Sequence, residues 1–291
     1  MLQKIFGKII VPVDGSYSCL WAREVAASIA KKFGSTVTAM HVISHEFMHP
    51  ESKAQHQSPR LILPPLVLHE LDKFYEEAGK KIIRDAEEFF KKENIEVETV
   101  LVRAEDPAEK ILQMVKESKY DLLVMGNISE TQAEHFALGS IAEKISLYAE
   151  CPVLITKKKT EITNLLVPVD GSRQAEKALE HAVLLCQHFK GAKMTILHVI
   201  DSQLFELQPK YAQEVGKNIL RQASAKAKEI DYDERLEFGD AAITIMKVAK
   251  QEDYDLIILG SRGIGTVKRY LLGSVSADVS MHAQRSVLIV R

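Results

Sequence analysis

The sequence repeats itself once, and this is the feature that most limits how the chain can fold. Five segments of the first half return in the same order in the second half. The pairs are KIIVPVDGS (8–16) with NLLVPVDGS (164–172), MHVI (40–43) with LHVI (197–200), KYDLLVMG (119–126) with DYDLIILG (253–260), LGSIAEKIS (138–146) with LGSVSADVS (272–280), and CPVLIT (151–156) with RSVLIV (285–290). A repeat of this extent predicts two copies of one fold in tandem.

The two copies are joined by a polar connector. KKKTEIT (157–163) separates the last shared segment of one copy from the first of the next, so we expect domains at 1–157 and 158–291. The first copy is longer, and its additional residues form an inserted segment at 45–70. Long connections of this kind serve as lids or docking segments, or pack on the domain surface. We expect the segment to pack on its own domain or on the other half.

Short apolar runs alternate with helical stretches along each copy. Continuous apolar runs are typical of strands buried on both faces. The order predicts an α/β fold of two tandem doubly wound parallel five-stranded sheets, Rossmann-like and related by a pseudo-two-fold axis. The expected helices are Ser18–Phe33, Leu71–Lys92, Ala108–Lys119 and Gly139–Ala149, and then Ala175–Phe189, Ala212–Glu229, Ala241–Gln251 and Gly273–His282.

Composition and charge exclude several classes of protein. A charged fraction of 27% with a net charge of −2 gives no field that attracts nucleic acid or an anionic membrane. The most apolar stretch, LILPPLVL (61–68), is too short to cross a bilayer, and the first residues do not resemble a signal peptide. Cys19, Cys151 and Cys186 are widely spaced, so we expect buried structural thiols and a cytoplasmic protein.

Histidines recur near the end of the second expected strand. His41, His45 and His49 are spaced by four residues, and imidazoles can gather a metal ion. His41 has a counterpart in His198 at the same place of the second copy. A shared structural role therefore explains His41 better than a metal site does.

A glycine-rich loop follows the fourth apolar run of the second copy. Gly260, Gly263, Gly273 and Ser274 follow the spacing G-x2-G-x9-G-S. Glycine at such places allows positive φ and a close approach of the backbone to a phosphate. Ser274 begins the next helix, whose free amides and dipole favour an anion. The alternative is that the glycines only make a tight connection between strand and helix.

The same loop carries positive charge. Arg262, Lys268 and Arg269 bring three cations and no acid lies among them, which suits a polyphosphate. The hydroxyl groups of Ser274 and Ser276 add two donors. In a parallel sheet ligands bind beyond the carboxyl ends of the strands, and the loop begins at one of those ends.

The glycine loop, the VPVDGS segment and the HV pair that closes the second strand resemble the universal stress protein family, in particular its tandem-domain members. The resemblance covers nearly the whole chain. It implies ATP or another adenine nucleotide as ligand, with or without Mg²⁺. It places around adenosine, ribose and phosphates Pro168, Val169, Asp170, Val199, Gly260, Gly263, Gly273, Ser274, Val275 and Ser276, to which we add Arg262 for its charge and position. The alternative role for Asp170 is to cap a helix.

The first copy has a different loop. Ser129 stands where the second copy has Gly263, and a serine there is unfavourable if φ must be positive. Glu130 and Glu134 replace the three cations, and charges of the wrong sign near a triphosphate oppose binding. We therefore expect weak nucleotide binding or none in the first domain, although Asp14 is retained. A metal ion or another loop conformation could rescue that site.

Three functions compete at this point. The first is a nucleotide-binding protein of stress response or regulation, the second is a slow ATPase or another enzyme, and the third is a scaffold with a purely structural nucleotide. The sequence contains no G-x-x-x-x-G-K-[ST] phosphate loop. The resemblance further implies pairing through the last strands, near Val153–Ile155 and Val287–Val290, as an intramolecular pseudo-dimer. Homodimerisation and protein partners stay open.

Overall fold

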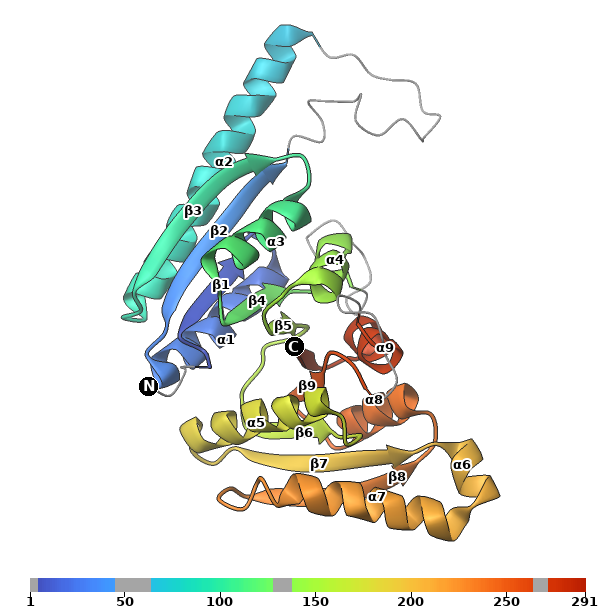
Figure 1. Ribbon diagram of the computed structural model, residues 1–291. Coiled ribbons are helices and arrows are strands. Elements are labelled where there is room, and N and C mark those ends of the chain that lie inside the picture. The colour runs from blue at the N-terminus through green and yellow to red at the C-terminus, as the bar shows by residue number, and fades with distance from the viewer. Residues whose placement is uncertain (1–4, 45–63, 128–137, 264–271) are drawn as a thin grey trace.

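A computed structural model describes residues 5–44, 64–127, 138–263 and 272–291. Strands and helices alternate along the first half, and also along the second except that α7 follows α6 directly (Figure 1). The first half contains β1 (Lys8–Pro12), α1 (Tyr17–Phe33), β2 (Thr36–Ser44), α2 (Pro65–Lys92), β3 (Val97–Ala104), α3 (Pro107–Ser118), β4 (Leu122–Gly126), α4 (Ser140–Tyr148) and β5 (Val153–Thr156). The second contains β6 (Asn164–Pro168), α5 (Arg173–His188), β7 (Lys193–Ile200), α6 (Ser202–Leu207), α7 (Pro209–Ser224), β8 (Tyr232–Phe238), α8 (Ala241–Gln251), β9 (Leu256–Gly260), α9 (Ser274–His282) and β10 (Ser286–Val290).

The described strands form one ten-stranded sheet in the order β3-β2-β1-β4-β5-β10-β9-β6-β7-β8. Within each half all neighbours are parallel. The halves meet where β10 pairs with β5 in antiparallel register, with Leu288 opposite Leu154. The predicted α/β class and the predicted pairing of the last strands are therefore confirmed. The two five-stranded sheets are joined into one.

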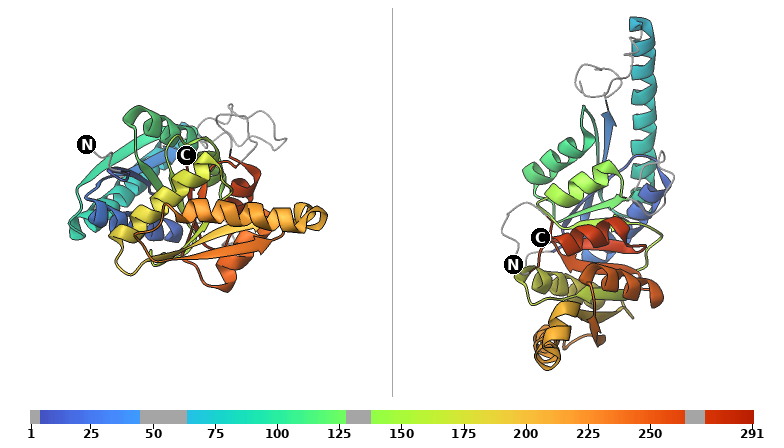
Figure 2. Two further views of the ribbon diagram at one scale, coloured as in Figure 1. Left: turned by 60° about the horizontal axis from the view of Figure 1, so that its bottom comes forward. Right: turned by 90° about the vertical axis from the view of Figure 1, so that its right-hand side faces the viewer.

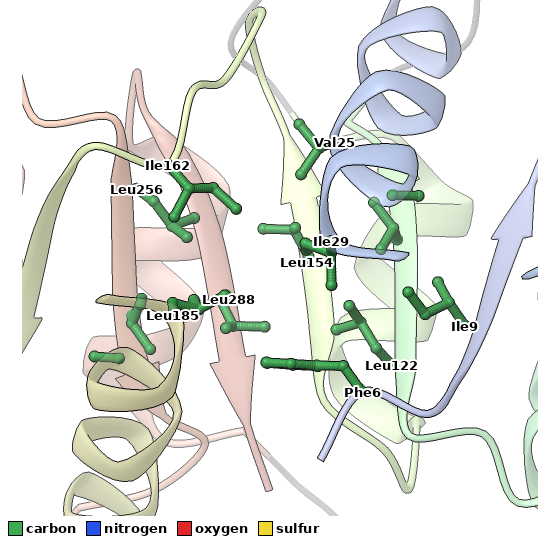
Figure 3. Packing of buried hydrophobic residues seen from close by; sticks show 14 of the residues in the cluster. Phe6, Ile9, Val25, Ile29, Leu122, Leu154, Ile162, Leu185, Leu256 and Leu288 are labelled. Carbon is green, nitrogen blue, oxygen red and sulfur yellow. The ribbon is translucent and has the colours of Figure 1, made fainter. Parts of the chain in front are cut away.

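Helices cover both faces of this sheet, as the two views of Figure 2 show. One buried cluster lies under α1, α2, α5 and α7, and a second lies under α3, α4, α8 and α9. Both clusters contain residues from both halves. Figure 3 shows Phe6, Leu154 and Leu288 together at the junction. A fully buried Phe contributes about 2–3 kcal/mol, so the junction belongs to the core.

The repeated Asp-Gly-Ser segment makes the turn from the first strand of each half into its helix. Gly15 and Gly171 have φ of 84° and 82°, in the left-handed region where a side chain is unfavourable. The Ser16 hydroxyl oxygen accepts from Cys19 N at 3.3 Å, and that of Ser172 accepts from the third helical amide at 3.1 Å. Each serine thus caps its helix.

Two helices differ from the sequence expectation. Helix α2 begins at Pro65 rather than Leu71, because proline is well tolerated at the first helical position. Its first residues belong to the inserted segment, and Leu66 and Val67 are exposed. The described part of that segment therefore does not pack on the domain as expected, while 45–63 lies outside the described residues. Helix α6 was not expected at all, since six residues give too little periodicity.

The three cysteines are buried and unpaired, as expected. Burial raises the pKa of Cys19 and Cys186 to about 11 and that of Cys151 to about 12. At neutral pH the thiols are protonated and act as small apolar groups. In the part of the chain that the structure describes, no helix is long and apolar enough to span a bilayer.

Two cationic side chains, at equivalent positions of the two halves, each form a hydrogen bond with the other half. Lys157 follows β5 and donates from Nζ to Met281 O at 3.0 Å, at the carboxyl end of α9. Arg291 follows β10 and donates to Ser146 O in α4. Both contacts place a positive charge near the carboxyl-terminal half of a helix of the other half, which the helix dipole favours. Burial lowers the pKa of Lys157 to about 8 and that of Arg291 to about 10.

Replacing Lys157 should change how stability depends on pH. Its folded pKa of about 8 lies below the ordinary 10.5, so the unfolded chain holds the extra proton between these values. The contribution of Lys157 to the free energy of unfolding therefore rises with pH in this window, by up to about 3 kcal/mol. We expect Lys157→Met to remove that rise, measured by urea unfolding from pH 7.5 to 10.5. The exposed Lys159→Met is the control, and parallel curves for all three proteins would contradict the assignment.

Candidate functional site

A cavity of about 260 Å³ lies in the second half, at the carboxyl ends of β6, β7 and β9 and the amino ends of α8 and α9. All of the site residues expected from sequence line it: Pro168, Val169, Asp170, Val199, Gly260, Arg262, Gly263, Gly273, Ser274, Val275 and Ser276. The strand ends and the glycine loop therefore meet at one crevice, and the binding of a nucleotide by these residues stays a prediction. The sequence reasoning missed six further lining residues, which are Ala175, Leu197, His198, Ala241, Ile245 and Leu259.

The missed residues are mostly apolar; three lie in β7 and β9, and Ala175, Ala241 and Ile245 lie in α5 and α8, from which no site residue was expected. Leu197 and Leu259 are near the ends of the strands that the motifs close, and Ile245 is in the second turn of α8. In the sequence they carry only the core pattern of a strand or helix. Their position relative to the strand ends was the one available signal.

The Asp170 carboxylate is held by the turn that it starts. Its Oδ1 accepts from Ser172 N at 2.9 Å. Ser172 caps α5, and its hydroxyl also donates to Arg262 O at 3.3 Å. Helix capping is therefore the role of Ser172, and Asp170 braces the turn while it lines the cavity. This small network ties the first strand of the half to the glycine loop.

The paired histidines have the structural role that the repeat indicated. His198 Nδ1 lies 2.7 Å from Val169 O, and His41 Nδ1 lies 2.6 Å from Val13 O. Each imidazole thereby holds the strand end beside its cavity. Among the described residues, no group of three or more His, Cys, Asp or Glu is arranged to hold a metal ion. His45 and His49 lie outside the described residues.

Glycine is needed in this loop because a side chain would not fit, and not because the backbone has a positive φ. Gly273 has φ −68°, and neither Gly260 nor Gly263 has a left-handed φ. A Cβ on Gly260 would lie 2.5 Å from the Gln174 carbonyl carbon, at the start of α5. A Cβ on Gly263 would overlap Asp170 Oδ2. The expectation of positive φ was wrong, because close contact between backbone segments also selects glycine.

The amino end of α9 lies at the cavity. Ser274 and Val275 line the cavity, and no side chain caps the helix at Gly273. The first amides of a helix have no acceptor within the helix, and the dipole is positive there. The Ser276 hydroxyl donates to Gly260 O at 2.7 Å. It is therefore engaged within the protein, and the expectation that it serves an anion as a donor is corrected.

Positive charge lies at the same cavity. Arg262 lines the cavity, and its charge is one cause, after burial, of the lowered pKa of Arg291. Arg291 is not among the described residues that line the cavity, and its guanidinium donates to Ser146 O in α4. Lys268 and Arg269 lie outside the described residues.

The first half has a cavity of similar size, about 270 Å³. Asp14, Val42, Gly139 and Ser140 line it at the positions equivalent to those of the second half. The described residues of the first half therefore enclose a crevice at the equivalent place. Ser129, Glu130 and Glu134, on which the expected difference in nucleotide affinity rests, lie outside the described residues.

Comparison with known proteins gives the family. The model of the universal stress protein family matches the chain twice, at residues 6–157 and 161–291. The chain belongs to the universal stress protein family. A universal stress protein from Methanocaldococcus jannaschii is 33% identical over 161 residues, which cover 54% of this chain and 85% of that relative. The crystal structure of a universal stress protein from Archaeoglobus fulgidus covers 100% of this chain and 99% of its own, with a TM-score of 0.69 at 20% identity. That likeness shows the tandem fold.

Two glycine substitutions should differ in their effect on stability. We expect Gly260→Ala to lower the free energy of unfolding by about 2–3 kcal/mol, because the added Cβ meets the backbone of α5. Gly263→Ala should cost less than about 1 kcal/mol, because the Asp170 carboxylate can turn away. Urea unfolding of both variants measures the difference. Equal losses would show that space around Gly260 is not the constraint.

Proposed function

We propose that the second half of this universal stress protein binds an adenine nucleotide, ATP in the first place, and that the protein acts as a nucleotide sensor in stress response or regulation. The observation that carries the proposal is that apolar side chains, a cation and the start of a helix line one cavity. Leu197, Val199 and Ile245 offer apolar surface that suits a base. Arg262 and the amino end of α9 suit phosphates.

The ribose has a partner in the same cavity. Asp170 lines the cavity, and its Oδ1 is held by the turn. A carboxylate accepts hydrogen bonds and matches the donors of a sugar. The residues that line the cavity therefore supply a place for base, sugar and phosphates in one crevice. The resemblance that the sequence shows to nucleotide-binding members of the family points to the same ligand.

We propose one ATP site per chain. The first-half cavity has Asp14 in place of Asp170, but Ile128 stands at the position of Arg262. The two acids at 130 and 134 replace the cations of the second loop. Repulsion between these charges and a triphosphate opposes binding.

The sensor is favoured over an enzyme by the chemistry of the lining. Among the described residues that line the cavity, Asp170 is the one carboxylate, and its Oδ1 accepts from Ser172 N. A hydrolase needs a base for water and commonly a second acid to hold a metal ion. Slow ATPase activity and a purely structural nucleotide remain the alternatives that experiments must separate.

Titration calorimetry of the full chain should show one ATP per chain. We expect Arg262→Ala to weaken ATP about tenfold, through loss of one charge-assisted contact. Asp170→Ala should weaken ATP at least about tenfold, because both the sugar contact and the brace on Ser172 are lost. The matched control is Asp14→Ala in the first half, which should leave ATP affinity unchanged. Two equal sites, or equal losses at Asp14 and Asp170, would contradict the proposal.

A single-turnover experiment separates sensor from enzyme. With protein in excess over ATP, we expect the bound nucleotide to be recovered intact over minutes, far below the turnover of about 1 s⁻¹ or more that is usual for enzymes. Rapid formation of ADP would make the protein an ATPase. In that case Asp170→Asn should abolish the product, since no other acid of the described lining could act as a base.

A further inference from the structure

We infer that the cavity of the first half is a second ligand site, which binds an uncharged heteroaromatic molecule with hydroxyl groups in preference to its phosphate esters. The inference goes beyond the proposed function and does not depend on it. It would stand even if the second cavity held no nucleotide, because it rests on the residues of the first cavity alone.

The first observation is that this cavity has been kept open. It measures about 270 Å³, against about 260 Å³ in the second half. Helix α4 begins at Ser140 after Gly139, whose φ of −68° and ψ of 154° match those of Gly273. Gly126 ends β4 and lies so close to Ser18 of α1 that a side chain would not fit, and Gly260 at the end of β9 has the same relation to α5. The frame of a ligand site is therefore intact on both sides of the chain.

The second observation is that sulfur-containing side chains line the first cavity. Cys19, Met40 and Met125 line it where the second cavity has alanine and two leucines. All three are buried. Thioether sulfur makes favourable contacts with aromatic rings, and methionine adapts its shape to a ring better than leucine does. Burial keeps the Cys19 thiol protonated and neutral. Such a wall suits a flat, uncharged ring.

The third observation is the sign of the charge. The described residues that line the first cavity include Asp14 but no lysine or arginine. The Asp14 Oδ1 accepts from Ser16 N at 2.9 Å and from the Ser16 hydroxyl at 2.6 Å. In the second half the equivalent serine hydroxyl donates to Arg262 O instead. A carboxylate without a cation in the wall repels a phosphate and accepts hydroxyl donors.

These observations define the ligand by its chemistry. A ring suits the sulfur-lined wall, hydroxyl groups suit the Asp14 carboxylate, and a phosphate meets no cation in the described lining. Adenosine and ATP form a matched pair of probes, because they share the ring and the sugar and differ in the phosphates. The first cavity should select adenosine.

Methionine methyl NMR of the full chain tests this site directly. Met40 and Met125 line the first cavity, whereas no methionine is among the described residues that line the second. Spectra of Met40→Leu and Met125→Leu assign the two signals. We expect adenosine to shift both with a Kd of about 0.1 mM, and ATP to shift them at least about tenfold more weakly. Calorimetry with ATP reports separately on the second cavity, so the two proposals can fail independently.

Paired blocking variants locate the ligand. Ser140 and Ser274 are exposed at the starts of α4 and α9 and line the two cavities in equivalent places. Ser140→Phe should abolish the adenosine shifts of Met40 and Met125, and Ser274→Phe should leave them unchanged. Asp14→Asn should bring the affinities for adenosine and ATP closer together. The inference would be overturned if the methyl signals of the wild type did not shift at 5 mM adenosine, which is about fifty times the expected Kd. Shifts by ATP as strong as those by adenosine, or shifts that survive Ser140→Phe, would also overturn it.

Discussion

The antiparallel pairing of β5 with β10 is the interaction on which the rest of the molecule depends. Each strand would be an exposed edge without the other, and an edge strand presents unpaired backbone groups to any neighbour. Leu154 and Leu288 face each other in this pair and are almost fully buried. The two hydrophobic clusters run through the junction from one half into the other. The halves are therefore two repeats of sequence and one unit of packing.

Close approach of backbone segments then shapes each cavity. The first helix of each half packs so tightly on the fourth strand that Gly126 and Gly260 leave no room for a side chain. That contact sets the distance between the Asp-Gly-Ser turn and the loop that follows the strand. In the second half the Ser172 hydroxyl bridges the two by donating to Arg262 O. The position of the charged groups is thus a result of backbone packing.

Much of this was readable from the sequence, and the failures have physical reasons. The repeat and the order of apolar runs predicted the fold, and the resemblance to the universal stress protein family supplied the pairing of the last strands and most of the residues that meet at the cavity. The reason inferred for the glycines was wrong, because a sequence cannot separate positive φ from lack of space. The hydroxyl of Ser276 looked available, yet it donates to Gly260 O, a partner distant in the sequence. Helix α2 begins at Pro65, six residues before the expected start at Leu71, because proline is tolerated at the first position of a helix.

Joining the two halves in one chain has a consequence for how such a protein can evolve. In a dimer of identical chains every substitution appears in both copies of a site. Here the strand pair must stay complementary across the pseudo-two-fold axis, but the crevices lie away from it and are encoded separately. One crevice contains Cys19, Met40 and Met125 where the other contains Ala175, Leu197 and Leu259. Covalent linkage thereby frees each crevice to diverge in ligand preference without disturbing the shared core.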